Sequence, residues 1–160
     1  MSKPPIHDDP LHKATQPIDY RNALVAVETV KNALKFIQVG LPIIRRGLMG
    51  EVHIDVPIMY QGFALGRIHY DPYAKLPSPK GRPVRVLGIS ISSEEVRNTM
   101  EAIIKEVYVI EACEYREPES AWVVPLAWSS IIIAHIKVSS DGREIIPDYG
   151  LTEELRRYTP

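Results

Sequence analysis

The feature that most constrains this 160-residue chain is an internal repeat. A helix-like segment that includes Glu28 recurs at Glu94, and a strand-like segment that begins at Val56 recurs at Val124. Self-similarity in the same order along a chain is typical of a duplicated structural unit. The matched positions are Glu28, Val30, Lys31, Asn32 and Leu34 with Glu94, Val96, Arg97, Asn98 and Met100, and Val56, Pro57, Ile58, Met59 and Tyr60 with Val124, Pro125, Leu126, Ala127 and Trp128.

The spacing of apolar residues predicts one helix at the start of each unit. Residues 20–38 carry an apolar stripe of helical period, and Asp19 is the expected N-cap. Residues 93–106 carry the second stripe, which Ser92 opens as a capping residue with Glu95 three positions on. The stripes coincide when the repeats are aligned, so we expect the same helix face to be buried twice.

Alternating apolar and polar residues predict strands after each helix. Pro42 and Gly47 weaken the prediction of a strand over 43–48, whereas Asp141-Gly142 strongly predicts a hairpin turn. A short helical turn is expected near the C-terminus, over 152–158. The expected strands are 51–59, 63–70 and 84–91 in the first unit, and 107–115, 121–127, 131–138 and 144–146 in the second.

These elements predict an α+β fold: a tandem duplication of helix-plus-antiparallel-meander units, with the helices packed on one face of a mostly antiparallel sheet. The other face of that sheet is expected to be open. Residues 1–18 are expected to form an extended N-terminal arm, 19–91 the first α+β unit and 92–160 the second. We expect the two units to pack as one compact domain.

Composition narrows the classes of function. The 19 basic and 20 acidic residues give a net charge of −1, which makes nucleic acid an unlikely partner. Cys113 is the only cysteine, so no intramolecular disulfide forms, and a reducing, cytoplasmic location is expected. No stretch approaches the roughly 18 uninterrupted apolar residues that predict a membrane span, and we therefore expect no membrane partner.

The predicted hairpin of the first unit carries the most suggestive polar residues. A three-residue turn at 60–62 would place His53 opposite His69 and Asp55 opposite Arg67, with Asp71 nearby. Two imidazoles with neighbouring carboxylates can bind a divalent metal or transfer protons, so His53, His69, Asp55 and Asp71 are candidate ligands. The alternative is the water-facing side of an amphipathic hairpin. No cofactor motif is present, and a divalent metal is the only candidate.

Two further features are candidate contact surfaces. The loop over 71–83 is rich in proline, which favours an extended backbone, and it is positively charged. A solvated connector is the alternative interpretation of this loop. Trp128, beside a predicted turn, is a candidate interface anchor. The candidate partner-binding residues of the loop are Tyr73, Lys75, Lys80 and Arg82.

The second unit also carries a family resemblance. Its helix and first strand are followed by Trp122-Val123-Val124, by Ile136-Lys137-Val138 and by the turn Asp141-Gly142. This order resembles a PepSY-type module, and the tandem arrangement is similar in architecture to the β-lactamase inhibitor protein fold. The resemblance implies a binding or inhibitory module.

Two hypotheses of function follow. The first is a non-enzymatic protein-binding or assembly module, a subunit or regulatory partner of a larger complex, which binds another protein or a second copy of itself. The absence of P-loop, GxGxxG, HExxH and GxSxG spacings favours it over an enzyme. The alternative is a small metal-binding or acid-base enzyme centred on the hairpin face of His53 and His69.

Overall fold

The computed structural model describes residues 3–7, 18–79, 84–85 and 90–158, which form an α+β fold. The first half contains α1 (Arg21–Leu34), β1 (Gln38–Val39), β2 (Ile43–Arg46), β3 (Glu51–Tyr60), β4 (Phe63–Asp71), β5 (Leu76–Ser78) and β6 (Val84–Arg85). The second half contains α2 (Ser93–Ile103), η1 (Ile104–Glu106), β7 (Tyr108–Val109), β8 (Glu114–Arg116), η2 (Glu117–Glu119), β9 (Ala121–Trp128), β10 (Ile131–Ser139), β11 (Ile145–Ile146) and α3 (Tyr149–Tyr158).

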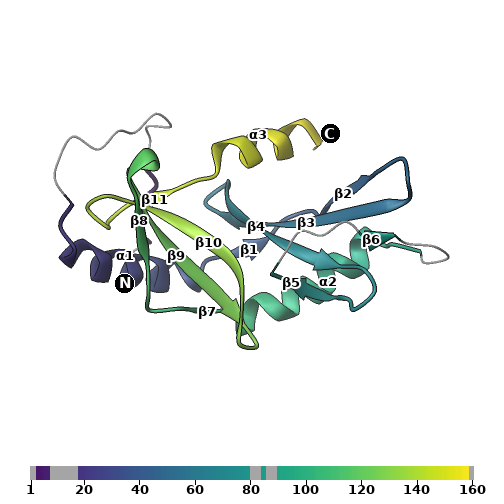
Figure 1. Cartoon of the computed structure of the whole chain (residues 1–160), viewed down its shortest axis with the longest axis horizontal. Coiled ribbons are helices and arrows are strands. Elements are labelled where there is room, and N and C mark those ends of the chain that lie inside the picture. Colours follow the sequence, from purple (N-terminus) through teal and green to yellow (C-terminus); the bar gives the residue numbers. More distant parts are fainter. Residues whose placement is uncertain (1–2, 8–17, 80–83, 86–89, 159–160) are drawn as a thin grey trace.

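The strands form two curled antiparallel sheets instead of the expected single sheet (Figure 1). In the first sheet, β3 pairs with β1, β2, β4 and β6, and β4 pairs with β5. In the second sheet, β9 pairs with β7, β8 and β10, and β10 pairs with β11. The order of pairing after each helix is therefore the same in both halves, apart from β6.

The two sheets meet where β4 lies beside β10, a line that we call the seam. The strands approach closely there because Gly66 has no side chain: a Cβ at this position would lie 2.9 Å from the carbonyl oxygen of His135. Backbone thus contacts backbone across the seam, although the two strands belong to separate sheets.

Each of the first two helices covers the sheet formed by the other half of the sequence (Figure 1). Helix α1 packs against β7, β9 and β10, and α2 packs near β1 and β5. Thr29 of α1 donates its hydroxyl to the carbonyl of Gly142 (2.5 Å), and Asn22 donates to the carbonyl of Ser140 (3.2 Å). The two helices therefore do not lie on one face of one sheet, as the sequence predicted. They are exchanged: each packs on the sheet formed by the other half.

Helix α3 covers the sheet face that was expected to be open. Leu151 is buried against Ile43 and Ala64, with Met59 and Leu155 packed around them. These residues lie on the face of the first sheet opposite the main core. The main core is shared by both halves, and its largest fully buried side chains are Trp122, Tyr60, Ile58, Ile68, Met100, Leu126, Ile136 and Ile145.

Several element boundaries follow from local chemistry. Ser92 caps α2 by accepting the backbone N–H of Glu95 (3.2 Å), as expected, and α2 with η1 covers the predicted 93–106. Strand β2 forms because Pro42 and Gly47 flank it without interrupting it. The predicted strand 107–115 is divided into β7 and β8, and 86–89 of the predicted strand 84–91 lie outside the described residues. No helix in the described ranges has the length and apolarity needed to cross a membrane.

Candidate functional site

The polar face of the first hairpin is organised around Asp55, a carboxylate that is only 5% exposed. Its Oδ2 accepts from Arg45 and from Arg67, each at 2.9 Å, and its Oδ1 lies 2.8 Å from Nδ1 of His69. Helix α3 adds Glu154, which pairs with Arg45 and lies 3.8 Å from Arg67. Strands β2, β3 and β4 thus present alternate residues toward α3, and the buried charge is fully paired.

The arginines and His69 determine the ionisation of Asp55. Burial alone would raise the pKa of this carboxyl group, but hydrogen bonds and charge from His69 and Arg67 outweigh burial and lower the pKa from 3.8 to about 2. An ionised carboxylate only accepts hydrogen bonds, so Nδ1 of His69 carries the proton.

This shift predicts a dependence of stability on pH. The folded-state pKa lies below the unfolded one, so ionised Asp55 adds about 2 kcal/mol to the free energy of unfolding above pH 4, from a shift of 3.8 to about 2. We expect that contribution to disappear as the pH falls from about 4 to about 2. Urea unfolding of the chain and of Asp55→Asn at pH 5 and pH 2 measures it. A stability difference that stays constant across this range would contradict the assignment.

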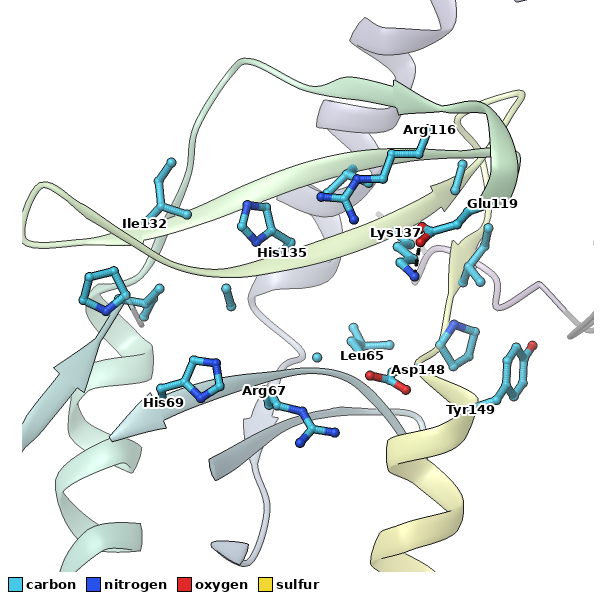
Figure 2. A pocket seen from close by; sticks show the side chains of 18 of the residues that line it. Leu65, Arg67, His69, Arg116, Glu119, Ile132, His135, Lys137, Asp148 and Tyr149 are labelled. Carbon is cyan, nitrogen blue, oxygen red and sulfur yellow. Dashed lines mark ion pairs between the residues drawn. The ribbon is translucent and has the colours of Figure 1, made fainter. Parts of the chain in front are cut away.

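A pocket of about 770 Å³ lies at the seam. Figure 2 shows it with Arg67 and His69, which both bond to Asp55, among its lining residues. Arg67 and His69 reach it from β4, His135 and Lys137 from β10, and Arg116 from β8. We call it the seam pocket. Its apolar lining comes from Leu65, Pro79, Pro118, Ala121, Val123, Ile132, Ile133, Ala134, Ile146 and Pro147.

The cations of the seam pocket differ in how firmly they are held. Arg67 is fixed by buried Asp55, whereas Arg116 pairs with Glu114 (3.2 Å) and Lys137 with Glu119 (3.0 Å) near solvent. Exposed ion pairs of this kind contribute about 0–1 kcal/mol each. Arg116 and Lys137 can therefore exchange their present carboxylates for those of a ligand at little cost.

The pocket is also lined by Asp148 and His135, which carry no positive charge at neutral pH. Asp148 accepts the backbone N–H of Leu151 (2.9 Å), so its carboxylate caps α3. Burial, aided by the charge of Arg116, lowers the pKa of His135, so its imidazole is neutral at neutral pH. The pocket thus combines cations whose ion pairs exchange easily, a neutral imidazole and an apolar lining, a combination suited to an anionic group with an apolar neighbour.

The structure corrects the predicted register of the first hairpin. Asp55 lies opposite His69, and His53 lies opposite Arg45 of β2, so the two histidines do not face each other. The turn is a two-residue one in which Gln61 and Gly62 both have positive φ. A β-bulge between the Ile58 and Met59 pairings then shifts the register. The prediction placed the right residues on one face and assigned them the wrong partners.

The four candidate metal ligands are not gathered at one place. Asp55 and His69 are in contact, but His53 lies nearer the start of β3, opposite Arg45. Asp71 accepts the backbone N–H groups of Tyr73 (2.8 Å) and Ala74 (3.2 Å) in the turn after β4. Within the described residues, no group of three or more His, Cys, Asp or Glu side chains is arranged to hold a metal ion.

The other predicted contact residues are divided between several places. Tyr73 is half exposed, and Lys75 pairs with Glu95 of α2 (2.7 Å). Lys80 and Arg82 lie outside the described residues, although the preceding Pro79 lines the seam pocket. Trp128 is partly buried, and its indole donates to Glu106 (2.9 Å). A role for these side chains in partner binding stays a prediction.

Sequence reasoning missed most of the pocket. His135 and Lys137 align in the repeat with Arg67 and His69, so the repeat already indicated that the two strands carry polar residues at equivalent positions. What it could not supply was the adjacency of β4 and β10. Arg45, Arg116 and Glu154 carried no recognisable pattern.

The comparisons with known proteins add no relative. No protein-family model matches the chain, and no curated protein or solved structure is significantly similar to it. The PepSY-type resemblance of the second unit therefore stays a prediction from sequence, and the geometry of the seam pocket has to support the function by itself.

Proposed function

We propose that this chain is a non-enzymatic binding module that receives a carboxylate-bearing segment of a protein partner in the seam pocket. The observation that carries the proposal is the convergence of Arg67, Arg116, Lys137, His69 and His135, from three strands, on one pocket of about 770 Å³. Pockets of this size and mixed lining are typical of ligand-binding sites. The partner is a second protein or another copy of this chain.

The side chains that line the pocket also favour binding over catalysis. Among the described residues lining the pocket there is no serine, threonine or cysteine to act as a nucleophile. The apolar lining favours a partner segment in which acidic and apolar side chains alternate. A cytoplasmic location, proposed from the single cysteine, is compatible with such a partner.

We further propose that the chain arose by tandem duplication. The recurrence of one pairing order, in which β1 to β5 correspond to β7 to β11, supports it. On this view the seam pocket lies between equivalent strands, β4 and β10. The halves differ at Asp55, whose equivalent is Val123, so only the first half carries the buried ionic cluster beneath α3.

The binding proposal is tested with a fluorescein-labelled hexapeptide of alternating glutamate and leucine, followed by fluorescence anisotropy at low salt. We expect Arg116→Gln and Lys137→Gln each to weaken binding about tenfold, because each loses a charge-assisted hydrogen bond. Arg156→Gln is the matched control: it removes one positive charge from an exposed pair on α3, outside the pocket, and should leave binding unchanged.

Two results would count against this proposal. Equal binding of a hexapeptide with glutamine in place of glutamate would show that the anionic group is not recognised. An equal loss of affinity in Arg156→Gln would show that only overall charge attracts the peptide. Raising the salt concentration should weaken binding to the chain, because exposed charges are screened.

The contact between Asp55 and His69 favours acid-base chemistry as a second candidate. A carboxylate bonded to Nδ1 orients the ring of a pocket histidine, and in the neutral form of that ring Nε2 is the basic nitrogen, the arrangement used in general base catalysis. Incubating the chain with a p-nitrophenyl ester of a short peptide tests this. Turnover that is lost in His69→Gln and retained in His53→Gln would support the second candidate.

A further inference from the structure

Residues 3–7 of the N-terminal arm lie against the edge of β11 and join it through one isolated β-bridge. Ile6 pairs with Ile145 in a parallel bridge. The backbone N–H of Ile145 donates to the carbonyl of Pro5 (2.8 Å), and the N–H of His7 donates to the carbonyl of Ile145 (2.8 Å). Main-chain bonds of this kind are how a sheet edge binds an extended peptide.

The same five residues contact both halves of the fold. Buried Tyr60, at the end of β3, donates its hydroxyl to the carbonyl of Pro4 (2.7 Å). The hydroxyl of Tyr149, in α3, donates to the carbonyl of His7. The arm therefore joins the turn of the first hairpin to β11 and to the start of α3.

The bound arm is continuous with one wall of the seam pocket. Ile146, Pro147, Asp148 and Tyr149 directly follow Ile145, and all four line the pocket. The arm bonds to Ile145, directly before this stretch, and to Tyr149, its last residue, and these bonds hold the wall in place.

We propose that the edge of β11 is a peptide-docking site for an extended segment of the Lys-Pro-Pro-Ile-His type, which residues 3–7 fill, and that its occupancy sets the affinity of the seam pocket. The first part stands on the arm's own contacts, and the second rests on the proposed binding function. Coupling of this kind is reciprocal, so a bound partner strengthens docking of the arm by the same factor.

The sequence of the arm fits this role. Pro4 and Pro5 favour an extended backbone before binding, which reduces the entropy lost on docking. Side-chain recognition comes from Ile6, which packs against the main core, and from Lys3, whose ammonium lies 5.1 Å from the ring centre of Phe36.

The docking site is tested in the full chain by hydrogen exchange. Tyr60→Phe combined with His7→Pro removes two of the arm's bonds, and we expect exchange at the Ile145 amide to become at least about tenfold faster. A synthetic peptide of residues 1–7, added in trans, should slow this exchange again. A peptide of the same composition in scrambled order should not, and Tyr158→Phe, at an exposed position of α3, is the control.

Unchanged exchange at Ile145 in the double variant, or equal protection by the scrambled peptide, would overturn the docking site. If the double variant does not fold, Tyr149→Phe removes one arm bond while keeping the ring, and the same exchange comparison applies to it. The coupling is measured separately, from the affinity of the double variant for the glutamate-leucine hexapeptide. We expect this affinity to fall at least fivefold and the trans peptide to restore it. No binding of the hexapeptide to the intact chain would refute the proposed function and the coupling, while the exchange experiment still decides the docking site.

Discussion

Gly142→Ala is expected to lower the free energy of unfolding by at least about 3 kcal/mol, the largest effect of any single substitution considered for this chain. Gly142 has φ +80°, a conformation that is strained for other residues. An added Cβ would also lie 2.6 Å from the carbonyl oxygen of Asn22 and 2.8 Å from the nitrogen of Ala26, both in the backbone at the start of α1. Chemical denaturation of the purified variant measures the loss.

Gly62→Ala separates the strain of a positive φ from the clash of an added Cβ with α1. Gly62 has nearly the same φ, +82°, but beyond its chain neighbours no described atom lies within 4 Å of the position that an added methyl group would take. This control should therefore lose only about 1 kcal/mol, the conformational part of the effect. Similar losses in the two variants would show that contact of the β10–β11 turn with α1 contributes little.

Asp55→Asn is expected to lower the free energy of unfolding by about 3 kcal/mol at neutral pH, because removing one member of a buried ion pair leaves its partners uncompensated. Arg45 and Arg67 would then share Glu154 as their remaining described partner, and His69 would lose the carboxylate that orients it. The size of the loss is moderated because both guanidinium groups keep some contact with solvent.

The control for this prediction is Glu153→Gln, one position before Glu154 on α3. Glu153 pairs with Arg156 at 3.0 Å, and both side chains are 60% exposed. Its loss should stay within about 0.5 kcal/mol, as for other exposed ion pairs. Urea unfolding at pH 7 compares the two variants, and an equally small loss for Asp55→Asn would contradict the role given to the buried carboxylate.

The sequence predicted local elements well where periodicity and turn chemistry act at short range. Ser92 and the Asp141-Gly142 turn define their helix and hairpin by bonds between residues a few positions apart. The hairpin of β3 and β4 was also expected, but its register was wrong because the positive φ of Gln61 and the following bulge leave no mark on the apolar alternation.

Periodicity and turn chemistry could not predict how elements distant in the sequence pack together. Nothing in the spacing of Leu151 and Leu155 indicates that α3 covers the polar side of the first sheet, and Glu154 joins Asp55 only through that packing. The seam pocket depends on the approach of β4 to β10 at Gly66. The residues on both sides were visible in the repeat, but their meeting is a property of the folded chain.

The exchange of α1 and α2 between the sheets has a consequence for the order in which the chain can fold during synthesis. The apolar face of α1 packs on β7, β9 and β10, so it has no sheet to cover until β10 has left the ribosome. The first sheet likewise stays uncovered until α2 has been synthesised. Contacts between residues so distant in sequence form slowly and leave apolar surface uncovered in the meantime. Neither half can complete its core alone, so a nascent chain depends on β9 and β10 to cover the apolar face of α1 and limit aggregation.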